Sequence, residues 1–302
     1  MEKSKILVTG ATGAIGGNAV RALKDSGFEV RALVREDDAR AAKLRALGAE
    51  TVIGDLLDID SVRAALQDVR AAYFVYPIRP QLLEATIYFA EAAKEAGVSA
   101  IVNTSQMTSR RDSKSHAAQN HWIGERVFDW CGVPVTHLRP TLFAEWLLYP
   151  FSLKSIVERE TLALPFGAGR FAPIASEDTG RVVAAILKNP TAHAGVTYKL
   201  FGPVELDGNG IAAAMSEVLK RAIRYSPMEI SDFQHILAQI PRLTPYFSQH
   251  VGAIAIDCQN GITAGTNNNV QELTGRRPMS VQEFVEKNWR SFEPSVSATS
   301  SA

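Results

Sequence analysis

The sequence predicts an α/β protein with a doubly wound parallel sheet and a smaller C-terminal lobe. Up to about residue 140, short aliphatic runs alternate with longer stretches of helical periodicity, which is typical of consecutive β-α-β units. After that point the sequence is rich in aromatic residues, Pro and Gly, and helical patterns follow. A chain of 302 residues with 46% hydrophobic content is long enough to bury both cores.

The strand candidates are short runs of branched aliphatic and aromatic residues. Six precede residue 140, at 5–9, 29–34, 50–54, 71–75, 100–105 and 135–140. Because the connections are long enough to hold a helix, we expect these strands to run parallel through right-handed crossovers. A seventh run, at 196–203, predicts a late return to the sheet.

The helix candidates carry apolar residues at intervals of three and four. Those between the strands are 13–27, 37–48, 58–69, 79–97 and 119–132, and four of them end in glycine, at Gly27, Gly48, Gly97 and Gly132. The later ones are 176–187, which Ser176 would cap, 210–221, 231–240 and 280–289.

A glycine pattern joins the first strand to the first helix. In "KILVTGATGAIGGNAVRAL", Gly10 permits a tight turn, Gly13 lets the backbone approach a pyrophosphate, and Gly16 lets the helix pack on the strand. The alternative is a glycine-rich turn without a ligand, but the strand-loop-helix context favours a dinucleotide site. We therefore expect a Rossmann domain at 1–150 to which 176–202 returns, a substrate lobe at 151–293, and a disordered tail at 294–302.

The end of the second strand predicts which dinucleotide binds. An NAD site would offer an acidic residue there, whereas this chain has Arg35, whose guanidinium suits a 2′-phosphate. NADPH is therefore favoured over NADH, although Glu36 and Asp37 could serve NADH if the loop turns. Arg40 is a second candidate cation or part of a solvated helix face. Asp55 and Leu56, after the third strand, would lie near the adenine, with helix capping as the alternative for Asp55.

Composition excludes several other classes of protein. Thirty-two basic and thirty-two acidic residues give no net charge, which disfavours nucleic-acid and anionic-membrane partners. Cys131 and Cys258 have no partner at metal or disulfide spacing and the six histidines are scattered, so we expect no metal. With no run of about 18 apolar residues and no signal segment, a soluble cytoplasmic protein with a small-molecule substrate is expected.

The motifs "VTGATGAIGG", "ALVR", "GDLLD", "HWIGERVFDWCGVPVTHLRP" and "NNNVQELTGRRPMSVQEFVEKN" occur in an order that resembles the NmrA-like group of atypical short-chain dehydrogenases. That group includes NADPH-dependent quinone and triphenylmethane-dye reductases, and also cofactor-sensing proteins with little or no catalysis. The resemblance implies a cleft between the Rossmann domain and the lobe. It also implies cofactor contacts by Gly10, Thr12, Gly13, Ala14, Ile15, Arg35, Val75, Tyr76, Pro77, Thr104 and Ser105.

The catalytic residues are harder to predict, because none of the seven tyrosines has a lysine four residues on. In the isoflavone-type reductases a lysine stands eleven residues before the glycine of a "GIP" turn. In this chain the residue eleven positions before Gly132 is His121. His121, placed in the first turn of its helix, could bind the nicotinamide ribose or donate a proton, or only pack. Tyr76 and Ser105 are the other candidate catalytic groups. Glu125 would either orient His121 or lie on the helix surface.

Aromatic residues after the sixth strand predict an apolar substrate cleft. Its expected lining is Phe143, Trp146, Leu147, Tyr149, Phe166 and Phe171, although some of these side chains could form the interdomain core instead. Such a cleft suits a flat conjugated molecule such as a quinone, dye, enone or iminium. The sequence thus predicts an NADPH-dependent reductase of such a molecule, with an NADP(H)-sensing regulatory protein as the alternative, either monomeric or homodimeric.

Overall fold

A seven-stranded parallel sheet forms the centre of the molecule in the computed structural model, which describes residues 5–293. Its strands are ordered β3-β2-β1-β4-β5-β6-β8, so the order reverses between β1 and β4. Their bounds are β1 Lys5–Val8, β2 Glu29–Val34, β3 Glu50–Ile53, β4 Val69–Phe74, β5 Ala100–Thr104, β6 Val135–Pro140 and β8 Thr197–Leu200. The predicted fold class is confirmed, and ligands of such sheets bind where the order reverses.

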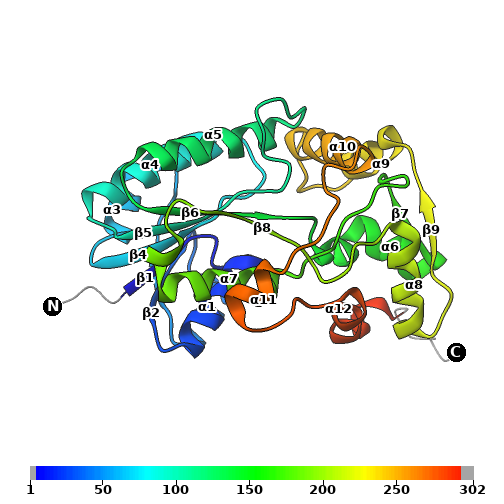
Figure 1. The fold of residues 1–302 in the computed structure, drawn as a ribbon, viewed down its shortest axis with the longest axis horizontal. Helices are drawn as coiled ribbons and strands as arrows, with labels where there is room; N and C mark the ends of the chain where they lie inside the picture. The colour runs from blue at the N-terminus through cyan, green and yellow to red at the C-terminus, as the bar shows by residue number, and fades with distance from the viewer. Residues whose placement is uncertain (1–4, 294–302) are drawn as a thin grey trace, which may run out of the picture.

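Helices cover both faces of this sheet (Figure 1). One face carries α1 Ala14–Asp25, α2 Ala39–Ala46, α7 Ser176–Lys188 and α11 Asn269–Thr274. The other carries α3 Ile59–Ala65, α4 Leu82–Glu95 and α5 His116–Trp130. Each face buries its own apolar cluster, and the rings of Phe74, Phe89 and Phe128 meet at centroid distances of 4.9 to 6.4 Å in the second. The sheet is therefore a rigid support for the loops at its carboxyl edge.

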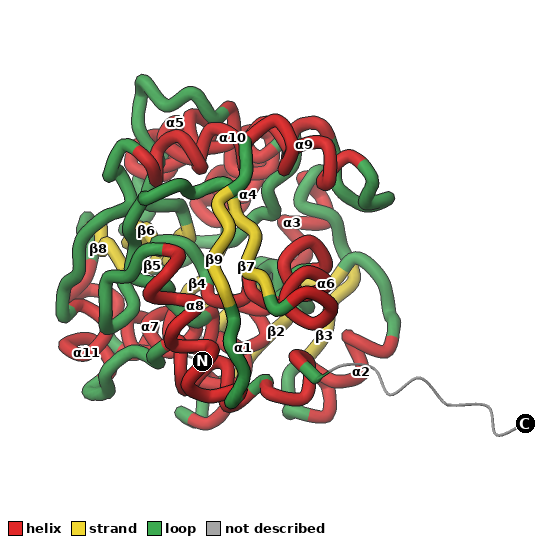
Figure 2. The backbone as a smooth tube through the Cα atoms, turned by 90° about the vertical axis from the view of Figure 1, so that its right-hand side faces the viewer, coloured by secondary structure: helices red, strands yellow, loops and turns green. Residues whose placement is uncertain are grey.

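The remaining elements form a lobe beyond that edge with a separate apolar core. Figure 2, viewed from the lobe side, shows its two strands next to each other. The lobe contains η1 Ala144–Leu148, α6 Pro150–Arg159, β7 Thr161–Leu164, α8 Gly208–Leu219, β9 Arg224–Pro227, α9 Ile230–Ala238, α10 Pro245–Gln259, α12 Val281–Lys287 and η3 Trp289–Phe292. Strands β7 and β9 pair in parallel. A short 3-10 helix, η2 Pro190–His193, precedes β8.

Several local expectations need correction. The helix expected from residue 119 begins at His116, because the Ser115 hydroxyl accepts a hydrogen bond from the Ala118 N–H and caps it. Ser176 does not cap α7, whose N-cap residue is Ala175; the Glu145 carboxylate accepts from the Ser176 N–H at 2.9 Å instead. Helices α6, α10 and α11 and strands β7 and β9 were not predicted.

The four glycines expected at helix ends do follow helices, and all have positive φ, between +63° and +84°. The tail expected at 294–302 lies outside the described residues. Between residues 5 and 293, no helix has both the length and the apolar character needed to cross a membrane.

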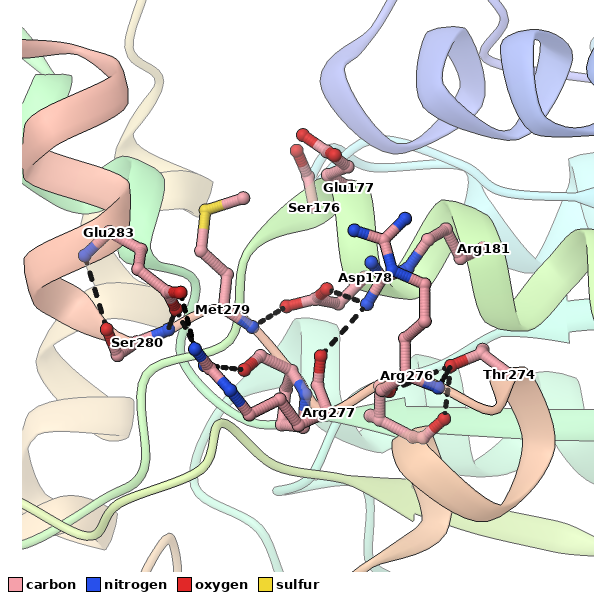
Figure 3. Close-up of polar contacts among 12 residues, drawn as sticks. Ser176, Glu177, Asp178, Arg181, Thr274, Arg276, Arg277, Met279, Ser280 and Glu283 are labelled. Atoms are coloured by element: carbon pink, nitrogen blue, oxygen red, sulfur yellow. Dashed lines mark hydrogen bonds and ion pairs between the residues drawn. The ribbon is translucent and has the colours of Figure 1, made fainter.

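The chain after α11 is fixed to the start of α7 by buried polar contacts (Figure 3). Asp178, fully buried, pairs with Arg181 at 2.5 Å and accepts a hydrogen bond from the Met279 N–H at 2.8 Å. Arg277 pairs with Glu283, which also completes a capping box with Ser280 at the start of α12. The Asp178–Met279 contact holds the C-terminal segment against the sheet domain, and the contacts of Glu283 order the segment where α12 begins.

Candidate functional site

The predicted cofactor residues meet at the carboxyl edge of the sheet because all seven strands run in the same direction. Gly10 follows β1, Arg35 follows β2, Asp55 follows β3 and Val75 follows β4. Thr104, with Ser105 after it, ends β5. The site thus spans the point where the strand order reverses.

The glycine loop has the form of a phosphate cradle. Gly10 has φ +56°, and a Cβ there would lie 2.5 Å from Val75 Cγ1, so this position requires glycine. A Cβ on Gly16 would lie 2.2 Å from the Gly10 carbonyl oxygen, which explains the close contact of α1 with β1. No side chain caps α1, and Gly13 and Ala14 at its start are exposed. The first N–H groups of α1 are therefore available to an anion.

Thr12 and Ile15, also predicted at the pyrophosphate, are half-buried within this loop. The Thr9 hydroxyl donates to the Val75 carbonyl at 3.1 Å and accepts from the Val75 N–H at 2.9 Å. This exchange fixes the exits of β1 and β4 side by side. No role for Thr9 was predicted from the sequence, although its place as the polar residue at the end of a buried strand is visible there.

Within residues 5–293, the charged residues after β2 are paired with one another except at Arg35 and Glu36. Asp38 caps α2 and binds Arg40 at 2.6 Å, and Asp37 binds Arg45 at 2.7 Å. Arg35 is exposed and has neither an ion pair nor a hydrogen bond within residues 5–293. The second candidate cation, Arg40, is therefore already occupied, and Arg35 is left free for an anionic ligand.

Asp55, Leu56, Tyr76 and Pro77 surround the neighbouring part of the edge. The Asp55 carboxylate accepts from the Leu57 N–H at 3.0 Å, while Asp58 caps α3, so helix capping does not explain Asp55. Leu56 is half-buried and Pro77 is exposed. Burial, followed by the charge of Asp55, raises the pKa of Tyr76, and its hydroxyl donates to the Pro80 carbonyl at 3.3 Å. Tyr76 thus lies close to Asp55 and Pro80, and its catalytic role stays a prediction.

The β5 exit is buried and its hydroxyls are satisfied. Thr104 exchanges a 2.8 Å hydrogen bond with the Tyr73 hydroxyl, and burial raises the pKa of that phenol well above its usual value. The Ser105 hydroxyl lies 2.9 Å from the Ser109 hydroxyl, and the Ser105 N–H donates to Leu138. In this arrangement Ser105 is a member of a buried pair, and its catalytic role stays a prediction.

His121 lies on the second turn of α5 rather than the first, and is only 6% exposed. Burial lowers its pKa to about 4, with a further contribution from His250 and an opposing one from Glu125. Within residues 5–293 neither ring nitrogen has a hydrogen-bond partner. His121 is therefore a neutral imidazole with free polar atoms.

Glu125 lies neither on the surface nor in a hydrogen bond with His121. Its carboxylate is fully buried and binds Arg139 of β6 through two hydrogen bonds of 2.8 and 2.5 Å. The i,i+4 spacing to His121 gave no sign of this partner, because Arg139 comes from another element.

A second buried imidazole, which the sequence did not reveal, faces this region from the lobe. His250 of α10 is 6% exposed, and its Nδ1 lies 2.7 Å from the Ser115 hydroxyl. Burial lowers its pKa to about 4. Next to it, Asn120 donates to the Tyr246 hydroxyl, and Arg110 binds the buried Asp257 through two bonds of 2.7 and 2.6 Å. The lobe is therefore clamped over the start of α5.

The aromatic residues predicted to contact substrate gather around one narrow apolar crevice. Its lining includes Phe143, Trp146, Leu147, Phe166 and Phe171. Leu147, Phe166 and Phe171 are buried and Trp146 is half-buried. Tyr149, also predicted, does not line the crevice; its ring is 40% exposed and stacks on Trp146 at a centroid distance of 6.5 Å. The crevice has a free volume of about 10 Å³, about the space of one water molecule. A flat ligand would have to displace these rings in order to enter.

Glu145, in the same segment, has an unusual environment. One carboxylate oxygen bonds the N–H and hydroxyl of Ser176, whose hydroxyl also accepts from Asn18 of α1, and the other oxygen is buried without a partner. Burial raises its pKa. This chain of contacts joins the glycine-loop helix to the aromatic segment. Among residues 5–293, no three His, Cys, Asp or Glu side chains are grouped as a metal site.

Comparison with known proteins gives matches along nearly the whole chain. The model described as the NmrA-like family matches residues 2–285. The NAD(P)H azoreductase of Xenophilus azovorans is 29% identical over 291 residues, which cover 95% of this chain and 99% of the azoreductase.

Two solved structures have a similar fold. The NADPH-dependent quinone oxidoreductase of Escherichia coli, complexed with NADPH, has a TM-score of 0.83 at 23% identity and covers 94% of this chain and 99% of its own. The Citrobacter sp. triphenylmethane reductase complexed with NADP(H) has a TM-score of 0.82 at 23% identity, with coverage of 93% and 99%. At such identities the likeness establishes the fold and leaves the chemistry to the site residues.

Proposed function

The chain belongs to the NmrA-like family, and from this premise we propose that it is an NADPH-dependent reductase of a conjugated or aromatic small molecule. One arrangement carries the proposal. An uncapped helix N-terminus and the unpaired Arg35 lie on one side of the sheet's carboxyl edge, and the neutral, unpaired His121 borders the lobe. Relatives named for azo, quinone and triphenylmethane reduction support the same class of acceptor.

The residues of the edge fit a dinucleotide phosphate. The N–H groups of Ala14 and Ile15, which have no acceptor among residues 5–293, would hold the pyrophosphate, and the Gly10 and Gly13 positions leave room for it. Arg35 would bind the 2′-phosphate, which its unpaired state favours. Reduced nicotinamide, when bound, supplies a hydride. In this proposal the sheet domain, expected at 1–150 with 176–202, holds the dinucleotide. The lobe, expected over the rest of 151–293, holds the acceptor, although in the fold η1 joins the lobe and α11 packs on the sheet.

The chain's own contribution to the chemistry is to orient the acceptor and stabilise charge. Since its pKa is lowered to about 4, His121 is neutral near pH 7 and carries one N–H. It would therefore act as a hydrogen-bond donor to the acceptor atom that becomes negative, and water would deliver the proton. The aromatic rings that line the crevice would have to move apart to admit a flat acceptor, and they would then exclude bulk water from it.

Turnover is the direct test. Purified protein is mixed with NADPH and a panel of naphthoquinones, azo dyes and triphenylmethane dyes, and cofactor oxidation is followed by absorbance. We expect oxidation that depends on the acceptor. Tight NADPH binding without turnover across the whole panel would refute the reductase and leave the NADP(H)-sensing alternative, which predicts a cofactor-dependent protein complex on a sizing column.

Replacing Arg35 tests the choice of cofactor. Arg35→Ala removes a charged hydrogen-bond donor worth about 1.5 to 3 kcal/mol, which corresponds to a Kd for NADPH about 10- to 150-fold higher. The Kd for NADH, which has no 2′-phosphate, should change little. Arg40→Ala is the matched control, because Arg40 is already bound to Asp38. An equal loss for both cofactors would contradict the assignment of the 2′-phosphate to Arg35.

A further inference from the structure

His250 lies where the lobe meets the start of α5, and its ring is held by a residue of that helix's cap. The Ser115 hydroxyl is fully buried and accepts the Ala118 N–H at 3.0 Å, which uses one of its lone pairs. The His250 Nδ1 atom lies 2.7 Å from this oxygen and is the one atom within residues 5–293 that could accept the Ser115 hydroxyl hydrogen. A buried hydroxyl hydrogen that has a single acceptor in reach donates to it.

This hydrogen bond determines the tautomer of the ring. If the Ser115 hydroxyl donates to Nδ1, the neutral imidazole carries its hydrogen on Nε2. The Nε2 atom has no partner in the described part of the chain, and His250 interacts electrostatically with His121 across the α5–α10 interface. The Nε2–H of His250 is therefore a donor that has no acceptor among residues 5–293, on a ring that interacts with the imidazole already assigned to the site.

The surrounding charged groups are satisfied elsewhere and do not compete for this donor. From α5, Glu125 is bound to Arg139, and His116 packs near the Tyr246 ring. From α10, Asp257 is bound to Arg110, and the Tyr246 hydroxyl accepts from Asn120.

We propose that His250, a lobe residue, supplies a second hydrogen bond to the acceptor, and that Ser115 is the positioning residue that fixes the Nε2–H tautomer of His250. The inference rests on the proposed reductase function. The negative charge that develops on an acceptor oxygen or nitrogen is shared between the donors of His121 and His250, and the neutralising proton comes from water. The site is complete only when the lobe is docked.

Two pairs of variants test this, first by turnover with 1,4-naphthoquinone as the probe. His250→Leu removes the donor and should lower kcat about 10²-fold, the scale of one lost donor to a developing oxyanion, with the Kd for NADPH unchanged. His250→Gln keeps an N–H donor and should recover part of the rate. Ser115→Ala should lower kcat in the same direction, whereas Ser115→Thr keeps the hydroxyl and should not.

The second readout does not need turnover. In ¹⁵N-labelled protein, the nitrogen shifts of His250 should show Nδ1 unprotonated and Nε2 protonated in wild type and in Ser115→Thr, and a mixture of tautomers in Ser115→Ala. A wild type that reduces naphthoquinone while His250→Leu reduces it equally fast would overturn the inference and leave the reductase intact. A wild type without turnover would count against the reductase, and a protonated Nδ1 in that protein would overturn the inference independently.

Discussion

The two buried histidines make stability depend on pH in a direction and size that follow from the structure. Burial lowers the pKa of both His121 and His250 to about 4, from about 6.5 in the unfolded chain. Between these values the unfolded state binds more protons than the native state, so stability is lost as pH falls. At pH 5 the loss relative to pH 7.5 is about 2 kcal/mol per histidine, and about 4 kcal/mol for the pair.

Other buried groups act in the opposite direction and must be separated from this effect. Burial raises the pKa of the Glu145 and Asp178 carboxyls, so the native state binds their protons first and gains stability as pH falls. A double variant, His121→Gln with His250→Gln, isolates the histidines because Gln does not titrate. Urea unfolding at pH 7.5, 6 and 5 should show the wild type losing about 4 kcal/mol more than this variant. Parallel curves for the two proteins would refute the assignment of neutral, buried imidazoles.

Two further predictions concern the glycine loop and the C-terminal segment. Gly16→Ala places a Cβ 2.2 Å from the Gly10 carbonyl oxygen, so it should cost about 1 to 3 kcal/mol and abolish NADPH binding by calorimetry. Gly124→Ala is the control: its Cβ would lie 3.5 Å from Thr86 Oγ1, so the change should be neutral or stabilise α5 by about 1 kcal/mol. Equal losses of stability and of NADPH binding in Gly16→Ala and Gly124→Ala would contradict the assignment of the glycine loop as the phosphate site. Asp178→Ala leaves Arg181 unpaired and the Met279 N–H without its acceptor. The free energy of unfolding should fall by about 3 to 5 kcal/mol, and hydrogen exchange of the Met279 amide should become faster. Glu283→Gln changes an exposed ion pair and keeps the capping box, so it should lower the free energy of unfolding by about 1 kcal/mol or less. A larger loss of stability for Glu283→Gln than for Asp178→Ala would show that Asp178 is not the main contact of the C-terminal segment.

The sequence predicted best those features that depend on neighbours in the chain. The class of the sheet followed from the periodicity of the apolar residues. The glycines at helix ends followed from the preference of glycine for positive φ. Arg35 could be located at the sheet edge because its position follows a strand end directly, and its role at a 2′-phosphate stays a prediction. The pairing of Arg40 with Asp38 was also accessible in principle, since an Asp at a helix N-cap position is a local signal that had been left unused.

The environment of individual side chains was predicted less well, because it depends on partners distant in sequence. Glu125 is one helical turn from His121, yet its charge is bound by Arg139 from a different strand. The aromatic residues of the expected cleft form a nearly closed crevice, since Trp146, Phe166 and Phe171 pack edge to face or tilted on one another. Composition predicts that such rings gather, but it does not fix how much space they leave.

The contribution of the lobe to the site could not be predicted from local sequence patterns. Helix α10 carries local start signals, Thr244 as its cap and Pro245 in its first turn, so its existence could have been predicted from the sequence. What gives the helix a role is the contact of His250 with Ser115, and these residues are 135 positions apart in sequence. Neither residue is informative alone: a serine before a helix is a cap, and a lone histidine on an apolar helix is a packing residue. Only the fold joins them, and it turns a capping hydroxyl into the group that determines which nitrogen of His250 carries the hydrogen.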